Sequence, residues 1–200
     1  GKMKLQFWLS TVLAIVTTCN GTWVNSSPAN PLPKNAVMIS NATLNPVPVY
    51  ECAVHANGSS SKMIAGALAY ERAWRCIYYD PSSSTKVSSL GPGKYQVFTD
   101  TFGDSHGTEA TAQKPFPSSA IQPFFSEYTS STGCQSTYAE IIGGFPYYFP
   151  TYGTALPDDS GNFVCFSVSY QLHAEGRFVQ GALPYNIAVT DSLQQNRGTI

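Results

Sequence analysis

The sequence contains three histidines, His55, His106 and His173, which could act in catalysis or bind a metal ion. No two of them lie two or four residues apart, the spacings with which a strand or a helix would bring ligands together, so we predict no metal site. Asp104, Ser105 and His106 place three triad residue types side by side, but triads assemble from distant residues, which favours a solvated loop. No GxSxG, HExxH or phosphate-loop motif occurs. We therefore predict no catalytic residues, cofactor or enzyme activity; the alternative, a hydrolase using Asp104 and His106, requires both in one cleft.

The densest aromatic run of the chain, FPYYFPTY at residues 145–152, could bind a ligand. Aromatic faces stack on the C–H face of a sugar, and tyrosine hydroxyls add hydrogen bonds. Alternatively, these rings fill the core of a β-fold rich in Gly and Pro. A Trp-Arg pair elsewhere presents the same two alternatives. The candidate ligand-binding residues are Tyr147, Tyr148, Tyr152, Trp74 and Arg75.

The first 21 residues have the pattern of a secretory signal peptide. Lys4 precedes an apolar stretch at 5–16, and small or weakly polar residues follow up to Gly21. The stretch is too short to span a bilayer, and a buried N-terminal helix or an uncleaved anchor is the alternative. We therefore expect a secreted, extracellular protein.

Cleavage there would remove Cys19 and leave four cysteines: Cys52, Cys76, Cys134 and Cys165. In an oxidising compartment these predict two disulfides, for which three connectivities exist. Pairing within each half of the chain is the simplest of the three. A zinc site is disfavoured because no CxxC occurs and no His neighbours a Cys.

Sequons for N-glycosylation cluster near the predicted signal peptide. We expect glycans at Asn25, Asn41 and Asn57, while the sequon at Asn20 lies beside the cleavage point. Serine-rich and asparagine-rich loops could also generate this pattern by chance. If the sequons are used, they place these stretches on the surface.

Composition excludes several classes of function. Of the 200 residues 42% are hydrophobic, which supports a folded core, but only 12% are charged, and the net charge is -1. Nucleic-acid binding and membrane-surface binding both require clustered Lys and Arg, so we expect neither partner. Aromatic residues make up 13% of the chain, and 16 Gly and 14 Pro supply turns. This composition predicts an all-β fold with few helices.

Two similar stretches suggest an internal duplication. Near the front, YECAV at 50–54 precedes a polar loop and a strand containing Gly66-Ala67-Leu68. Near the back, VCFSV at 164–168 precedes a polar loop and a strand containing Gly181-Ala182-Leu183. We therefore predict two related antiparallel β-modules, at 32–100 and 137–191. Between them, residues 101–136 are rich in Thr, Ser, Gly and Pro, which predicts a linker-like segment.

The order of several short motifs resembles a DM9 repeat, the DUF3421 family. The motifs are LPKNAV at 32–37, AVHANG at 53–58, IAGA at 64–67, RCIYY at 75–79 and YQVF at 95–98. The similarity covers 32–98, and a weaker one covers 161–183. It implies two β-prism-like repeats and, as in some relatives, a lectin that binds mannose.

The family's own sugar-binding positions are not retained in this chain. The carboxylate position after NAV falls near Asn41 and Ala42, and the lysine position falls on Ala67. We therefore do not carry those two roles over. The resemblance and the exported context together predict a non-enzymatic, lectin-like module that binds glycans or glycoconjugates. The alternative is an extracellular structural or matrix protein without sugar binding.

Overall fold

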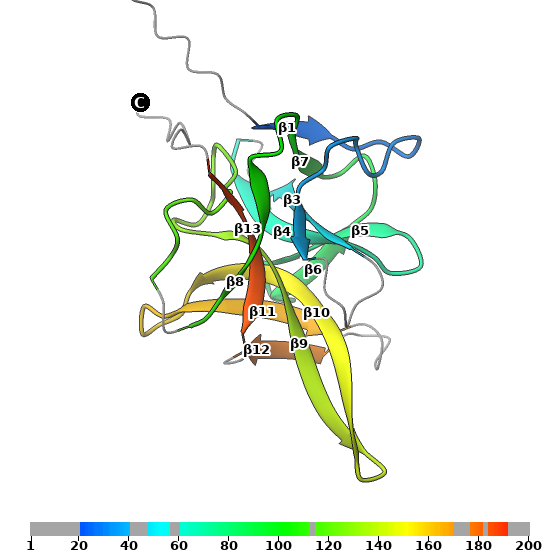
Figure 1. Cartoon of the computed structure of the whole chain (residues 1–200), viewed down its shortest axis with the longest axis vertical. Coiled ribbons are helices and arrows are strands. Elements are labelled where there is room, and N and C mark those ends of the chain that lie inside the picture. Colours follow the sequence, from blue (N-terminus) through cyan, green and yellow to red (C-terminus); the bar gives the residue numbers. More distant parts are fainter. Residues whose placement is uncertain are drawn as a thin grey trace, which may run out of the picture.

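The computed structural model describes residues 21–40, 48–56, 61–112, 115–169, 177–181 and 184–191. These residues form strands, turns and loops with no helix among them, which confirms the all-β prediction (Figure 1). Of the predicted signal peptide, only Gly21 is described, as the first residue of a strand. Asn41 and Asn57 also lie outside the described residues. Asn25 is exposed at the end of β1, where a glycan would not be buried.

The first half of the chain forms one antiparallel sheet, here called the first sheet. Its strands are β1 (Gly21–Asn25), β2 (Met38–Ser40), β3 (Val49–His55), β4 (Met63–Tyr70), β5 (Trp74–Tyr79), β6 (Val87–Leu90) and β7 (Gln96–Asp100). Their order is β1-β7-β3-β4-β5-β6, and β2 pairs with β3.

The second half forms another antiparallel sheet, the second sheet. Its strands are β8 (Ser105–Ala110), β9 (Thr132–Ile142), β10 (Phe145–Pro157), β11 (Phe163–Ser169), β12 (Arg177–Gly181) and β13 (Tyr185–Thr190). Their order is β12-β11-β10-β9-β13-β8. The structure confirms two antiparallel sheets, while the relation between the two predicted modules, their bounds at 32–100 and 137–191 and the β-prism arrangement stay predictions.

Much of the segment expected to be linker-like belongs to the fold. Residues 101–136 contain all of β8 and the beginning of β9, and both strands pair with β13. The connection between them buries Ala120 and Ile121 completely or almost so. Composition was misleading because the small polar residues here, such as Thr132 and Ser136, occupy buried strand positions rather than solvated ones.

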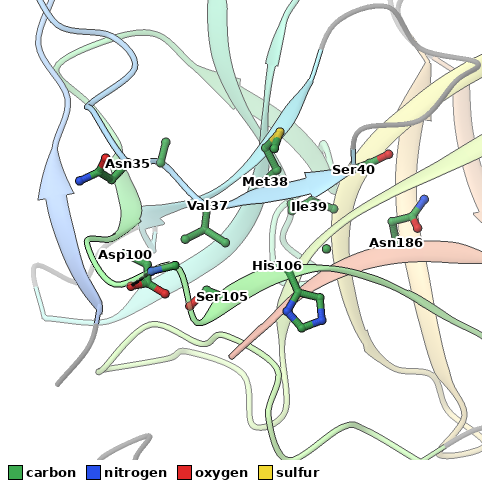
Figure 2. A pocket seen from close by; sticks show the side chains of 12 residues that line it. Asn35, Val37, Met38, Ile39, Ser40, Asp100, Ser105, His106 and Asn186 are labelled. Atoms are coloured by element: carbon green, nitrogen blue, oxygen red, sulfur yellow. Dashed lines mark hydrogen bonds between the residues drawn. The ribbon is translucent and has the colours of Figure 1, made fainter. Parts of the chain in front are cut away.

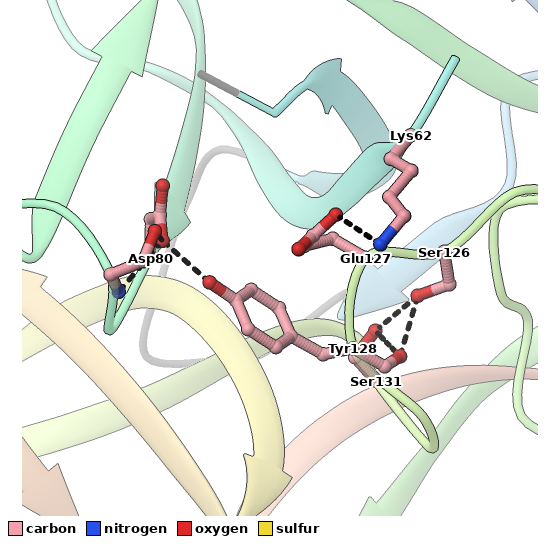
Figure 3. Close-up of polar contacts among 7 residues, drawn as sticks. Lys62, Asp80, Ser126, Glu127, Tyr128 and Ser131 are labelled. Carbon is pink, nitrogen blue, oxygen red and sulfur yellow. Dashed lines mark hydrogen bonds and ion pairs between the residues drawn. The ribbon is translucent and has the colours of Figure 1, made fainter. Parts of the chain in front are cut away.

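The same connection is tied to the first sheet by polar contacts (Figure 3). The Tyr128 hydroxyl donates to Asp80 Oδ1 at the end of β5 (2.5 Å), and Lys62 Nζ lies 3.2 Å from Glu127 Oε2. Burial alone would raise the pKa of Asp80, but hydrogen bonds from Ser82 and Tyr128 lower it below its usual value. Asp80 is therefore a buried, ionised acceptor that fixes the connection.

The main core lies between the two sheets. Ile39, Val49 and Ile77 of the first sheet pack with Tyr152 and Val168 of the second. On β4, Ala67 and Ala69 join this core, whereas the alternate residues Ile64 and Leu68 pack on the opposite face around the Cys52–Cys76 disulfide. The alternation follows from the two-residue period of a strand, and β4 is buried on both faces.

Both disulfides join cysteines within the same half of the chain, as the simplest connectivity predicts. They are Cys52–Cys76 and Cys134–Cys165. Each bridge connects the two strands that flank a central strand: β3 and β5 flank β4, and β9 and β11 flank β10. The Cα atoms are 6.0 and 5.9 Å apart. Two flat strand spacings would separate them by about 9.5 Å, so both sheets curl sharply here.

A glycine in each central strand permits this curling. Gly66 lies opposite Cys52, and Gly153 lies opposite Cys134. A Cβ atom on Gly66 would contact the carbonyl oxygen of Ile77, and one on Gly153 would overlap the carbonyl oxygen of Phe166. The sequence repeat aligned Cys52 of β3 with Cys165 of β11. Each of these two strands pairs with the next strand of the chain and has a glycine, Gly66 or Gly181, opposite its cysteine.

A carboxyl group is buried where the sheets meet. Glu51 on β3 is 0% exposed; its Oε1 accepts from the Gly133 amide (2.8 Å) and the Thr132 hydroxyl (3.3 Å) of β9. Its Oε2 has no hydrogen-bond partner among the residues that the structure describes. Burial raises the pKa of Glu51 well above 4.5, and the two hydrogen bonds only partly offset this.

We expect Glu51→Gln to stabilise the protein at neutral pH. Above about pH 4.5 the unfolded chain releases the Glu51 proton while the folded protein retains it, so stability falls with rising pH by about 1.4 kcal/mol per pH unit until the folded pKa is passed. Glutamine has no proton to lose, and the variant should exceed the parent by about 1–3 kcal/mol at pH 7. Urea unfolding between pH 4 and 7 measures this. The control Glu109→Gln changes an exposed carboxyl of β8 and should leave the pH profile unchanged.

Candidate functional site

A pocket opens where the two sheets meet. Its volume is about 470 Å³, within the range of small-molecule sites. It is lined by β2 and the residues before it, by the β7–β8 turn and the start of β8, and by Asn186 of β13 (Figure 2). None of the lining residues is Lys or Arg.

Close backbone packing brings the two walls of the pocket together. Gly107 of β8 lies so close to β2 that a Cβ atom there would overlap the Ile39 carbonyl. On the other side, the Asp100 amide donates to the Asn35 carbonyl (2.9 Å). Asn35 itself has a φ of 61°, a left-handed conformation that asparagine tolerates better than most residues. The pocket therefore exists only when both sheets are assembled.

Asp100 is the most distinctive group in this pocket. It ends β7 and is 6% exposed. Its Oδ1 accepts from the amides of Phe102 (2.9 Å) and Gly103 (3.1 Å), which fixes the carboxyl group at the turn. Its Oδ2 is fully buried and has no hydrogen-bond partner among the described residues. A buried carboxylate oxygen normally has such a partner, so a shift of the pocket wall that exposes Oδ2 would let a donor bind there.

Asp100 is ionised in this setting. Burial alone would raise the pKa of Asp100, but interactions with Ser105 and with the backbone amides of Phe102 and Gly103 lower it below 3.8. A negative oxygen is a stronger acceptor than a neutral one. The pocket therefore offers one charged acceptor beside the uncharged polar side chains of Asn35, Ser105 and Asn186.

The triad residue types in the pocket are not arranged as a triad. Ser105 and His106 are consecutive in β8, so their side chains leave the strand on opposite sides; Ser105 lies beside Asp100, and the His106 ring points away (Figure 2). His106 Nδ1 lies 3.7 Å from Asp191 Oδ2, and both side chains are largely exposed. This geometry gives Ser105 no histidine base, and its side chain interacts with the Asp100 carboxylate instead.

The structure does not bring the five predicted ligand-binding residues together. Tyr147 and Tyr148 are exposed on the outer part of the β9–β10 hairpin. Trp74 and Arg75 lie on β5 in the first sheet, where Trp74 packs edge-on against Tyr50 and Tyr70 and Arg75 donates to Ser89 Oγ (2.9 Å).

The prediction for Tyr152 is wrong. This side chain is 2% exposed and belongs to the core between the sheets. Burial raises the pKa of the neighbouring Glu71, and a hydrogen bond with Tyr152 partly offsets it. Tyr152 therefore fills the core, as the alternative interpretation of the aromatic run held.

Sequence reasoning missed Asp100 and Asn186. Asp100 had a weak signal, since an Asp at a strand end followed by Gly three residues later (DTFG at 100–103) is typical of a turn. Nothing in the sequence connects it to Asn186, 86 residues away. Two sequence features pointed to this region, the NAV motif at 35–37 and the stretch 104–106, and all of the first and Ser105 and His106 of the second line the pocket.

The parts of the chain that are described contain no cluster of three or more His, Cys, Asp or Glu side chains able to hold a metal ion. They also contain no helix long and apolar enough to cross a membrane. Comparison with protein-family models, curated proteins and solved structures finds no match to this chain.

Proposed function

We propose that this protein is a secreted, non-enzymatic recognition module that binds glycans or glycoconjugates through the pocket around Asp100. The observation that carries the proposal is the ionised Asp100 carboxylate in the pocket lining, whose buried Oδ2 has no hydrogen-bond donor among the described residues and would meet a ligand after a small shift of the pocket wall. A sugar hydroxyl supplies such a donor and can accept a hydrogen bond in return from an asparagine amide. The two disulfides support an oxidising, extracellular compartment.

The lining suits a neutral, polyhydroxylated ligand better than an anion. Asn35, Ser105 and Asn186 provide uncharged donors and acceptors, and Val37 and Met38 provide apolar surface for the C–H groups of a sugar. An anionic ligand would face Asp100 without a Lys or Arg in the lining to offset it. Neutral glycans are therefore the proposed ligand class.

We expect Asp100→Asn to weaken binding to neutral glycans by about 10–100-fold, because a hydrogen bond to a charged acceptor contributes about 1.5–3 kcal/mol. The substitution keeps one oxygen for the turn amides and replaces only the charged group. The measurement is a glycan array with oxidised, secreted protein, followed by titration of the best neutral glycan.

Asp158→Asn is the matched control. Asp158 also accepts from two turn amides, those of Ser160 and Asn162 (both 2.9 Å), but lies outside the pocket. The Asp158→Asn variant should bind neutral glycans as tightly as the parent protein. Absence of glycan binding by the parent, or equal loss of binding in both variants, would contradict the proposal.

An extracellular structural or surface protein without sugar binding is the second candidate. It is favoured by one observation, the concentration of exposed apolar side chains on the outer β9–β10 hairpin. A parent protein that binds no glycan but self-associates would support this candidate.

A further inference from the structure

The β9–β10 hairpin extends beyond the rest of the second sheet and ends in apolar residues (Figure 1). Its turn is Gly143-Gly144, whose φ values of 60° and 87° suit a tight two-residue hairpin. We call residues 141–146, IIGGFP, the hairpin tip, and all six are exposed. Ile141 (77%) and Phe145 (70%) are the two most exposed large apolar side chains in the described part of the chain. Exposed apolar groups gathered in this way mark an interaction surface.

Both faces of the hairpin carry the same order of side chains. Residues that pair across two strands share a face, and successive residues alternate between faces. On each face an apolar pair lies next to the turn, and a tyrosine follows it at the next position of β10. The members are Ile142, Phe145 and Tyr147 on one face and Ile141, Pro146 and Tyr148 on the other. The tip is therefore apolar on all sides, and its partner must surround it.

Polarity rises with distance from the turn. The two pairs nearest the turn contain no polar side chain, and Tyr147 and Tyr148 follow with 48% and 59% exposure. Glu140, the only charged residue of β9 and β10, lies opposite Tyr147. An apolar end, then tyrosines, then a charge is the order of environments met on leaving a bilayer, from hydrocarbon through the interface to water.

We propose that the hairpin tip inserts into the interfacial layer of a bilayer of zwitterionic lipids, with Tyr147 and Tyr148 at the level of the headgroups. Tyrosine is enriched at that level in membrane proteins. Two residue pairs at about 3.4 Å per residue give a depth of about 7 Å. Segments that lie in the membrane interface enter it by about 5–10 Å, so this depth is sufficient.

The two apolar faces favour lipid over a protein partner. Lipid surrounds an inserted element, so an element of this kind requires apolar groups on every side. A second copy of the chain, or another protein lying against one face, would leave the apolar groups of the opposite face in water. Glu140 limits the depth of insertion, because a carboxylate is costly to transfer into hydrocarbon.

The charge of the hairpin specifies the class of lipid. No Lys or Arg occurs from 137 to 157, so anionic headgroups have nothing to attract there. The expectation of no membrane partner rested on this same absence, which concerns electrostatic attraction alone. Insertion of apolar side chains is driven by the hydrophobic effect and requires no basic cluster. Binding should therefore not increase when anionic lipid is added.

Flotation of the secreted chain with phosphatidylcholine vesicles, with and without phosphatidylserine, tests the proposal. The parent should float with both. Ile141→Asp combined with Ile142→Asp should lower its partition coefficient at least about tenfold, because two apolar side chains are replaced by charges. The matched control is Phe124→Asp combined with Phe125→Asp, a second pair of consecutive exposed residues (57% and 66%) outside the hairpin. This control should float like the parent, and all three proteins should share one unfolding temperature.

A fluorescent variant tests the depth of insertion. In Phe145→Trp the added indole should shift its emission to the blue when phosphatidylcholine vesicles are added, with the parent as the baseline. Lipids brominated near the headgroup end of the acyl chain should quench it more than lipids brominated near the chain end, since insertion is shallow. Emission that does not change with vesicles would contradict insertion of the tip.

Three flotation results would overturn the proposal. They are a parent that does not float with phosphatidylcholine, an Ile141 and Ile142 double variant that floats like the parent, and a control that loses as much binding as that variant. A parent that stays in the lipid-free fraction and sediments as a dimer, with a monomeric Ile141 and Ile142 double variant, would instead make the tip a contact between copies of the chain.

Discussion

Gly133→Ala is expected to destabilise the protein by at least about 3 kcal/mol and to reduce its secretion sharply. Gly133 of β9 lies directly against Gly66 of β4, and a Cβ atom there would overlap the Gly66 carbonyl oxygen and lie 2.8 Å from Glu51 Oε2. The Gly66 carbonyl oxygen belongs to the backbone, so it cannot rotate away as the end of a side chain could. Relief would require the two sheets to separate, and overpacking of this kind costs more than the usual 1–3 kcal/mol.

Secreted yield and thermal unfolding measure this effect. Gly91→Ala is the matched control, because no atom lies within 4 Å of a Cβ built there. It should leave both quantities close to those of the parent. A Gly133→Ala protein secreted and melting like the Gly91→Ala protein would show that the sheets do not pack as closely as described.

Removing the second disulfide by Cys134→Ala combined with Cys165→Ala should cost about 3–4 kcal/mol. The bridge closes a loop with a sequence separation of 31, and cross-linking a loop of this length restricts the unfolded chain by about that amount. The variant should also lose affinity in the pocket. Cys134 lies opposite Ile187 in the β9–β13 register, and β13 carries Asn186, which lines the pocket.

Urea unfolding and glycan titration test the two parts of this prediction. Removal of Cys52 and Cys76, whose separation is 24, should cost a similar free energy. The first bridge lies on the face of the first sheet away from the second, so its removal should affect ligand affinity less. A loss below about 1 kcal/mol would contradict the chain-entropy argument.

Several parts of the fold could be predicted from residue type and spacing. Alternating apolar residues between turn formers indicated an all-β chain, and the structure confirms it. The prediction of a linker-like segment at 101–136 failed because composition does not distinguish a solvated serine or threonine from one that is buried in a strand. Thr132 and Ser131 are both 0% exposed.

The aromatic run shows why site prediction failed in part. Tyr148 and Tyr152 are four residues apart on one strand and share a face, yet one is 59% exposed and the other 2%. The difference arises because Tyr152 packs in the core between the two sheets, whereas Tyr148 lies on the outer part of the β9–β10 hairpin. The packing of one sheet on the other decides this, and local sequence does not encode it.

The sequence by itself therefore determined the β-class, because this depends on local pattern. It favoured pairing of the cysteines that lie close along the chain, and the structure decided among the three connectivities. Secretion and glycosylation remain predictions from local motifs. Only the tertiary structure decided which polar groups meet. Asp100, Asn35 and Asn186 come from three strands or turns on two sheets, and the close approach of Gly107 to β2 brings them around one pocket. The position of the Asp100 carboxylate in that pocket, which carries the proposed function, is a property of that assembly.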